Sequence, residues 1–148
     1  MNATCHQRTI EVRTRGRGLV NVTDSVGAIV AEAGVDVGLC SVFLQHTSAS
    51  LVVQENADPA VLRDLERWIE KLAPESKSYE HNDEGPDDMP SHLRTSITHT
   101  SETLPVTGGK IALGTWQALY VWEHRTSPHV RRLVITVWGA ARGKESGR

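Results

Sequence analysis

The alternation of apolar and polar side chains predicts a series of short strands along the chain. Ile10 and Val12 lie on one side of an extended stretch over residues 4–14, and polar side chains lie on the other, which is the period of a half-buried strand. Residues 38–45 are mostly apolar, so we expect a central strand covered on both faces. The same criteria place further strands at residues 19–22, 104–106, 110–113, 116–125 and 133–138, of which the last is also expected to be central.

Three other stretches have the spacing of a helix that buries one side. A helix through about Ala33 follows three residues whose side-chain oxygens can cap it, Thr23, Asp24 and Ser25. Asp58 and Pro59 form a strong helix start, as N-cap and first helical residue, and this helix ends near residue 73. Pro90 is placed to begin a short helix that extends to about residue 99.

These elements do not alternate regularly, which predicts the α+β class. We expect one compact domain over residues 1–139, with a mixed or antiparallel layered β-sheet core and two or three helices. The chain has no GxGxxG motif, no Walker loop and no βαβ repeat, which argues against Rossmann-like, P-loop and TIM-barrel folds. Residues 140–148 are small or charged and are expected to form a flexible tail.

Composition narrows the classes of partner. A formal net charge of −2 and a sequence pI of about 6.4 leave no global basic field for nucleic acid or an anionic membrane. The N-terminus has no apolar signal region and no apolar run approaches 18 residues, so we expect a cytoplasmic protein. Cys5 and Cys40 lack CxxC spacing and are expected to be buried or half-buried free thiols.

The stretch YEHNDEGPDDMPSHL, residues 79–93, is the strongest candidate for a site. It concentrates two histidines and five carboxylates in fifteen residues, and Gly85-Pro86 and Met89-Pro90 fix its shape as a loop. His81 and His92 are eleven residues apart, so they converge only if the loop folds back on itself. The alternative is a solvated acidic loop with incidental histidines.

Two further stretches carry polar chemistry. Residues 46–50 place one imidazole and three hydroxyls after an apolar strand, which indicates either a pocket wall or a polar bulge in a hairpin. Glu55 and Asn56 precede a helix, where their side chains could enter the same pocket as His46. The turn at residues 15–18, Arg-Gly-Arg-Gly, either holds an anion or is a solvated basic turn.

Four segments together resemble the YjbQ-like family, whose members are described as secondary thiamine-phosphate synthase enzymes. The segments are HTSASLVVQENADP (46–59), YEHNDEGPDDMPSHL (79–93), LGTWQALYVWEHR (113–125) and PHVRRLVITVWG (128–139). The resemblance spans nearly the whole chain. It implies a small α+β domain, usually a homotrimer, with a pocket at the histidine-bearing blocks, which here fall on His46, His81 and His92.

A divalent metal site follows as a hypothesis from these three histidines. Three imidazoles suffice for a metal centre that leaves positions open, so we expect His46, His81 and His92 to bind zinc, with manganese or iron as alternatives. Carboxylates beside them are left for catalysis, either as a general base or in orienting the ligands. The candidates are Glu55, Asp87 and Asp88.

The reaction implied by the resemblance joins a pyrimidine pyrophosphate to a thiazole phosphate. Positive side chains would stabilise the leaving pyrophosphate, and the candidates are Arg125, Arg131 and Lys110. The remaining substrate-binding candidates are polar residues of the same segments: Thr47, Ser48, Asn56, Thr115, Gln117 and His129. Hydrolysis or phosphoryl transfer at the same metal would use nearly the same residues. The competing class is a trimeric metal- or ligand-binding protein without catalysis.

The aromatic face of the strand at residues 116–125 has two interpretations. Trp116, Tyr120 and Trp122 share one side of this strand. They are expected in the core or in a subunit interface. The alternative is an aromatic wall that stacks a heterocyclic substrate.

Overall fold

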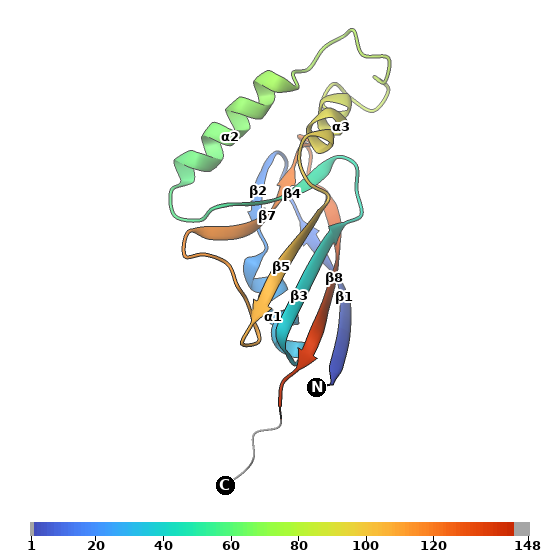
Figure 1. The fold of residues 1–148 in the computed structure, drawn as a ribbon. Helices are drawn as coiled ribbons and strands as arrows, with labels where there is room; N and C mark the ends of the chain where they lie inside the picture. Colours follow the sequence, from blue (N-terminus) through green and yellow to red (C-terminus); the bar gives the residue numbers. More distant parts are fainter. Residues whose placement is uncertain (1, 144–148) are drawn as a thin grey trace.

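Two antiparallel sheets form the framework of the protein (Figure 1). The computed structural model describes residues 2–143. The five-stranded sheet has the order β1 (Ala3–Arg13), β8 (Val130–Ala141), β3 (Val35–Leu44), β5 (Ser101–Thr107) and β6 (Lys110–Ile111). The three-stranded sheet has the order β2 (Gly18–Asn21), β7 (Gln117–Glu123) and β4 (Ala49–Glu55). Every strand pair in residues 2–143 is antiparallel, so the predicted α+β fold is confirmed.

The core lies on the inner faces of the two sheets and on one side of α1 (Thr23–Glu32). Alternate residues of each strand enter it, as the period of two predicts. Its fully buried members include Val26, Val30, Val42, Leu51, Leu119, Leu133 and Ile135. This core fixes the strand register, because a slip of one residue would turn each buried side chain outward.

α1 begins at Thr23, but its N-cap is Val22 and no side chain caps it, so the expected capping by Thr23, Asp24 or Ser25 is wrong. The start of α2 (Pro59–Leu72) is predicted correctly. This helix starts directly after Asp58, whose side chain accepts a hydrogen bond from the Ala60 N–H at 2.9 Å. α3 (Asp88–Ser96) starts two residues before the expected Pro90. Proline is tolerated there because the N–H groups of the first helical turn have no partner within the helix. The earlier start brings Asp88 into the helix.

The outer face of the five-stranded sheet is open in the single chain. The strand expected to be covered on both faces, β3, is central in the sheet, yet Leu39 is 39% and Phe43 is 48% exposed. On the neighbouring strand β8, Trp138 pairs with Leu39 and is 38% exposed. The apolar run therefore predicts the strand correctly, but residues 2–143 cover only one of its faces.

Three smaller expectations have mixed outcomes. Cys5 and Cys40 are both free thiols, but Cys5 is exposed, whereas burial raises the pKa of Cys40 to about 11. Ala140 and Ala141, expected in the tail, belong to β8, and residues 144–148 lie outside the described part of the chain. Within that part, no helix is both long and apolar enough to cross a membrane.

Candidate metal centre

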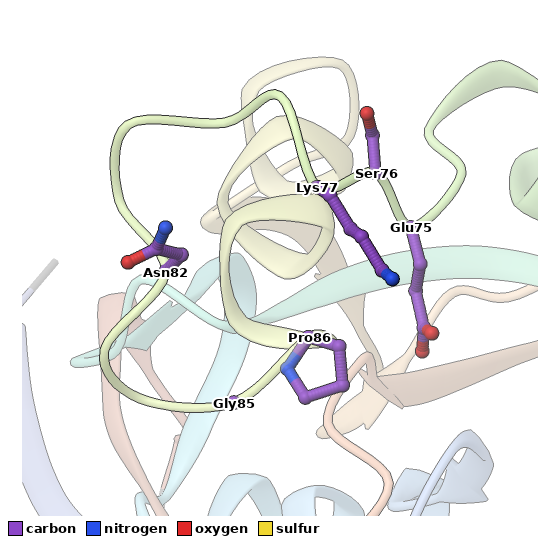
Figure 2. Close-up of a pocket in the computed structure, with 6 residues that line it drawn as sticks. All are labelled: Glu75, Ser76, Lys77, Asn82, Gly85 and Pro86. Carbon is purple, nitrogen blue, oxygen red and sulfur yellow. The ribbon is translucent and has the colours of Figure 1, made fainter.

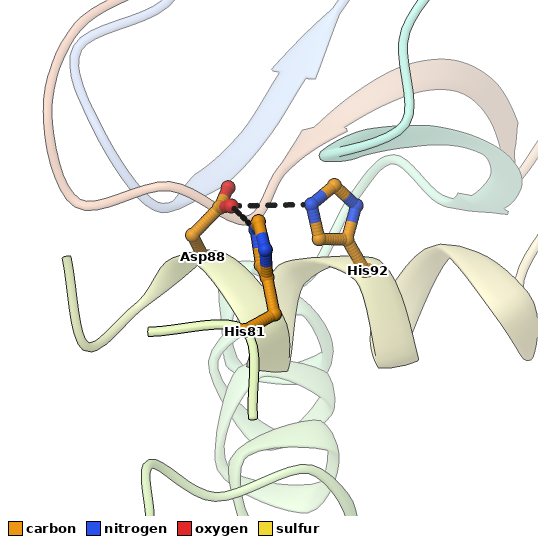
Figure 3. Close-up of side chains that lie close together, drawn as sticks. All are labelled: His81, Asp88 and His92. Carbon is orange, nitrogen blue, oxygen red and sulfur yellow. Dashed lines mark hydrogen bonds and ion pairs between the residues drawn. The ribbon is translucent and has the colours of Figure 1, made fainter. Parts of the chain in front are cut away.

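Asp88, His92 and His81 converge at the start of α3. Asp88 and His92 are four residues apart, so they lie on the same side of this helix. His81 comes from the α2–α3 loop, and Figure 3 shows its side chain beside those of Asp88 and His92. Oδ2 of Asp88 lies 2.5 Å from Nε2 of His81 and 3.2 Å from Nε2 of His92. The three side chains offer one ligand atom each, all within 4.8 Å of one another.

The backbone of the β3–β4 turn determines how His92 can act. Nδ1 of His92 lies 2.9 Å from the carbonyl oxygen of Thr47, which only accepts, so Nδ1 carries a proton. In the neutral ring Nε2 then has a free lone pair, directed at a carboxylate oxygen of Asp88. Two acceptors facing each other require a proton or a cation between them. This arrangement, an imidazole oriented by a carbonyl, is the usual support of a metal-binding histidine.

Arg125 and Asp87 hold Asp88 in place. Nη1 of Arg125 donates to Oδ1 of Asp88 at 2.8 Å, which leaves Oδ2 for the histidines. Nε of Arg125 donates to Oδ2 of Asp87, also at 2.8 Å, and its Nη2 donates to the carbonyl of Glu84. Asp87 further accepts a hydrogen bond from the Thr126 backbone N–H. Arg125, expected to bind substrate, and Asp87, expected in catalysis, are therefore engaged in positioning Asp88.

The environment keeps both carboxylates ionised. Burial acts to raise the pKa of Asp88, but the hydrogen bond from His81 and the charge of Arg125 outweigh it and hold that pKa below its ordinary value. The pKa of Asp87 is also lowered, because hydrogen bonds from Thr126 and Arg125 outweigh burial. An ionised carboxylate between two imidazoles is a suitable donor set for a divalent cation.

The structure places His46 outside this group, although it adjoins Thr47. Nε2 of His46 accepts a hydrogen bond from the Arg132 backbone N–H at 2.9 Å. Burial and then the charge of Arg131 lower the pKa of His46, which agrees with a neutral ring that accepts at Nε2. Within one chain, the third place of the expected three-histidine set is taken by Asp88. The segment around His46 contributes the Thr47 carbonyl instead.

Arg131 is committed to a buried ion pair with Glu123. Its Nε donates to Oε1 at 2.8 Å and its Nη2 to Oε2 at 2.5 Å, and both side chains are almost wholly inaccessible to solvent. Ser48 accepts a further hydrogen bond from Arg131, and Thr14 donates one to Glu123. His129 lies at the edge, with Nδ1 3.8 Å from Glu123. In this chain Arg131 and Ser48 thus hold the framework together, and neither is free for substrate.

Four other candidates gather at the opposite end of β4. Asn56 donates hydrogen bonds from its side-chain amide to the carbonyls of Thr115 and Gln117, at 3.0 and 3.2 Å. The carbonyl of Glu55 accepts a hydrogen bond from the Tyr120 hydroxyl. The length of β4, about 20 Å, separates this group from the turn that contacts His92. Lys110 lies apart in the edge strand β6, and the other predicted site residues form two groups in one chain.

Two depressions open along the α2–α3 loop. The first, of about 410 Å³, borders the metal centre, since its walls are Tyr79, Glu80, His81 and Met89. Figure 2 shows the second, of about 490 Å³, between the two arms of the folded loop. Its lining residues are Glu75, Ser76, Lys77, Asn82, Gly85 and Pro86. Of the two, the first is lined by one of the three converging residues, His81.

The outer face of the three-stranded sheet, beside α2, carries buried polar groups that no sequence pattern singles out. Nε2 of His124 lies 2.9 Å from the Ser50 hydroxyl, while its Nδ1 has no partner within residues 2–143. Nε of the buried Arg94 also lacks a partner in that range. Trp122 packs against His124 with ring centroids 5.2 Å apart. Tyr120 and Trp122 are buried here, whereas Trp116 is 64% exposed.

His124 is expected to make the fold less stable in acid. Burial, followed by the charges of Arg94, Arg131 and Arg17, lowers its pKa to about 3 from an ordinary value of 6.5. The unfolded chain therefore binds the extra proton between these values. The neutral His124 therefore contributes its full stability to the fold above about pH 6.5. As pH falls below this value, the free energy of unfolding decreases, by roughly 2 kcal/mol at pH 5.

Urea unfolding of the wild type and of His124→Gln at pH 7.5 and pH 5 measures this contribution. The free energy of unfolding should drop by about 2 kcal/mol less in the variant than in the wild type. His99→Gln, which changes an exposed histidine, should behave like the wild type. If the free energy of unfolding drops equally in His124→Gln and the wild type, His124 is not the cause of the loss of stability at pH 5.

Comparison with known proteins identifies similar sequences along most of the chain. The family model for UPF0047 protein YjbQ-like matches residues 8–140. A UPF0047 protein of Synechocystis is 47% identical over 135 residues, which cover 90% of this chain and 92% of that protein. UPF0047 protein YjbQ of Escherichia coli O157:H7 is 43% identical over 135 residues, which cover 90% of this chain and 98% of that protein.

Solved structures show the same fold. A YbjQ-like protein of unknown function from Sulfolobus solfataricus superposes with a TM-score of 0.85 at 27% identity, covering 93% of this chain and 99% of that one. A conserved hypothetical protein from Thermus thermophilus has a TM-score of 0.76 at 33% identity, and the match covers 86% of this chain and 97% of that one. The matched family region, residues 8–140, includes the α2–α3 loop.

Proposed function

The chain belongs to the UPF0047 family of YjbQ-like proteins. From the convergence of His81, Asp88 and His92 we propose that it is a small metal-dependent enzyme. One observation carries the proposal: Nε2 of His81, Nε2 of His92 and Oδ2 of Asp88 converge within 4.8 Å of one another. The Thr47 carbonyl fixes His92 in the form that binds a cation.

The donor set fits several divalent metals. Two imidazole nitrogens and one carboxylate oxygen suit zinc, our first choice, and the same combination holds manganese or iron in other proteins. Three protein ligands leave positions open, and a metal so bound would supply a Lewis acid and an activated water. The protein's own part is to keep Asp88 ionised and fixed, through Arg125 and Asp87.

A phosphorylated heterocycle is the proposed substrate class, with thiamine-phosphate synthase-like transfer as the proposed reaction. The depression beside His81 combines the flat ring of Tyr79 and the thioether of Met89 with a charged end, which suits such a molecule. Hydrolysis or phosphoryl transfer would use the same residues, so a substrate screen should include the phosphate esters alone as well as the coupled pair.

A second candidate function is a trimeric metal- or ligand-binding protein without catalysis, and the open sheet face supports its self-association. Leu39, Phe43 and Trp138 are exposed on adjacent strands of the five-stranded sheet, and an apolar face of this kind suits association with another copy. Self-association as a trimer is compatible with both functions. Coordination separates them, because a closed site with four ligands favours a structural metal and a site that binds water favours catalysis.

Asp88→Asn tests the metal site directly. The amide keeps the shape of the side chain but removes the negative charge, so zinc affinity should fall by about 100-fold or more. Calorimetric titration of zinc into metal-stripped protein measures this. Asp83→Asn, which neutralises an exposed carboxylate of the same loop, is the matched control and should bind like the wild type. Equal zinc affinity in wild type and Asp88→Asn would refute the assignment.

A further inference from the structure

The turn between β1 and β2 gathers three arginines around one depression. Arg13, Arg15 and Arg17 line an open hollow of about 400 Å³, together with Gly16 and neighbouring residues at the start of β2. The side chains of all three arginines are exposed. The protein as a whole is slightly acidic, so three positive charges at one hollow are a local feature that the overall composition does not predict.

These arginines lack partners that would neutralise them. The arginines that form ion pairs within residues 2–143 are Arg8, Arg67, Arg125 and Arg131. In the same range, no carboxylate lies within ion-pair distance of Arg13, Arg15 or Arg17. The backbone N–H groups of residues 15–17 also donate to no backbone carbonyl in this range. The turn therefore presents guanidinium and amide donors together, and both are available to a ligand.

Glycine allows this turn to pack against the turn that supports the metal centre. Gly16 has φ +115°, and a Cβ at this position would lie 2.6 Å from the carbonyl oxygen of Thr126. The N–H of Thr126 donates to Asp87 at 2.9 Å, and the preceding Arg125 holds Asp88. The arginine turn thus packs against Thr126, and Thr126 and Arg125 contact Asp87 and Asp88 of the candidate metal centre. Thr14 strengthens the contact through its N–H bond to the His129 carbonyl.

We propose that Arg13, Arg15 and Arg17 form a binding site for the phosphate or diphosphate group of a small ligand. Guanidinium groups bind phosphate oxygens through paired, charge-assisted hydrogen bonds, and a glycine turn exposes backbone N–H groups to the same oxygens. Assigning this ligand to the substrate of the metal centre rests on the proposed function. It would give that centre a place for the anionic end of a phosphorylated heterocycle, a role that Arg125 and Arg131 cannot fill because carboxylates occupy them.

Calorimetric titration of inorganic pyrophosphate into metal-free protein at low salt tests the site. The wild type should bind one pyrophosphate per chain, and Arg15→Ala/Arg17→Ala should bind it on the order of 100-fold more weakly, since two charge-assisted contacts are lost. Arg63→Ala/Lys71→Ala removes the same charge from exposed positions of α2 and should match the wild type. Absence of saturable binding by the wild type, or equal affinity in Arg15→Ala/Arg17→Ala, would show that the turn is only solvated.

Two further titrations separate this site from the metal centre. Asp88→Asn should bind pyrophosphate in the metal-free state as the wild type does, and Arg15→Ala/Arg17→Ala should bind zinc as the wild type does. If Asp88→Asn keeps full zinc affinity while the arginine variant loses pyrophosphate, the anion site stands and the proposed metal centre fails. If both variants lose pyrophosphate equally, the arginines are not the specific determinant and the anion site is rejected.

Discussion

Breaking the buried pair of Glu123 and Arg131 is expected to destabilise the protein by about 3–5 kcal/mol. In Arg131→Met, the carboxyl group of Glu123 would have no guanidinium partner in a position with no access to solvent. Burial acts to raise the pKa of Glu123, but the hydrogen bonds from Arg131 and Thr14 outweigh it, so the carboxylate is ionised in the intact protein. Without Arg131 the cost of burying that charge has no compensation.

Urea unfolding of the single and double variants measures the interaction. Glu123→Gln and Arg131→Met should each lose several kcal/mol, and the double variant should lose much less than the sum, because no unpaired charge remains. Arg132→Met is the matched control, since its side chain is exposed on the next residue of β8. Additive losses in the double variant would mean that the two side chains are not coupled.

Replacing His81 and His92 together should abolish stoichiometric metal binding. Each imidazole supplies one of three ligand atoms, and a single carboxylate on α3 is too weak a site to retain zinc against dialysis. The fold should persist, because both rings are partly exposed and neither belongs to the hydrophobic core. Zinc content after dialysis, together with the melting temperature of His81→Ala/His92→Ala, provides the measurement.

A matched double variant controls for loss of imidazole as such. His6 and His99 each contact a single glutamate, Glu32 and Glu102, away from the metal centre. His6→Ala/His99→Ala should therefore keep the metal content of the wild type. Retention of one zinc per chain by His81→Ala/His92→Ala would place the metal elsewhere in the protein.

Local signals in the sequence predict much of the fold. Asp58 and Pro59 predict the start of α2 because capping depends only on neighbouring residues. The alternation around Ile10 and Val12 predicts β1 for a similar reason, since side-chain direction follows from the strand period. Local patterns do not show which faces of a strand are covered by other parts of the protein. Phe43 lies in an apolar run, yet its side chain is 48% exposed.

The candidate site could be predicted only in part. The composition of the α2–α3 loop identifies His81 and His92. With the helix start placed at Pro90, however, Asp88 lies outside the helix, and its position on the same side as His92 is not predicted. That placement favours a catalytic role for Asp88 over a metal-binding one. The bonds from Arg125 join residues 37 and 38 positions apart in the chain. Such long-range pairs depend on how the sheet and the loop pack, which the sequence pattern does not encode.

His46 shows the opposite case, a residue in the right segment with a different contact. Its chain neighbour Thr47 reaches the site through a backbone carbonyl, a group that every residue has and no sequence pattern can single out. The imidazole of His46 instead accepts a hydrogen bond from β8. Sequence alone could therefore locate the β3–β4 turn near the site but could not choose the atom that acts there.

Metal content of protein purified without a metal-affinity tag is the most direct test of the metal centre. We expect close to one transition metal per chain by elemental analysis, with zinc first, and its loss in Asp88→Asn. Native mass measured on the same preparation would show whether the metal-bearing species is a trimer. Wild-type protein that is free of metal and also fails to bind zinc, manganese or iron on titration would contradict the proposal that His81, Asp88 and His92 form a metal centre.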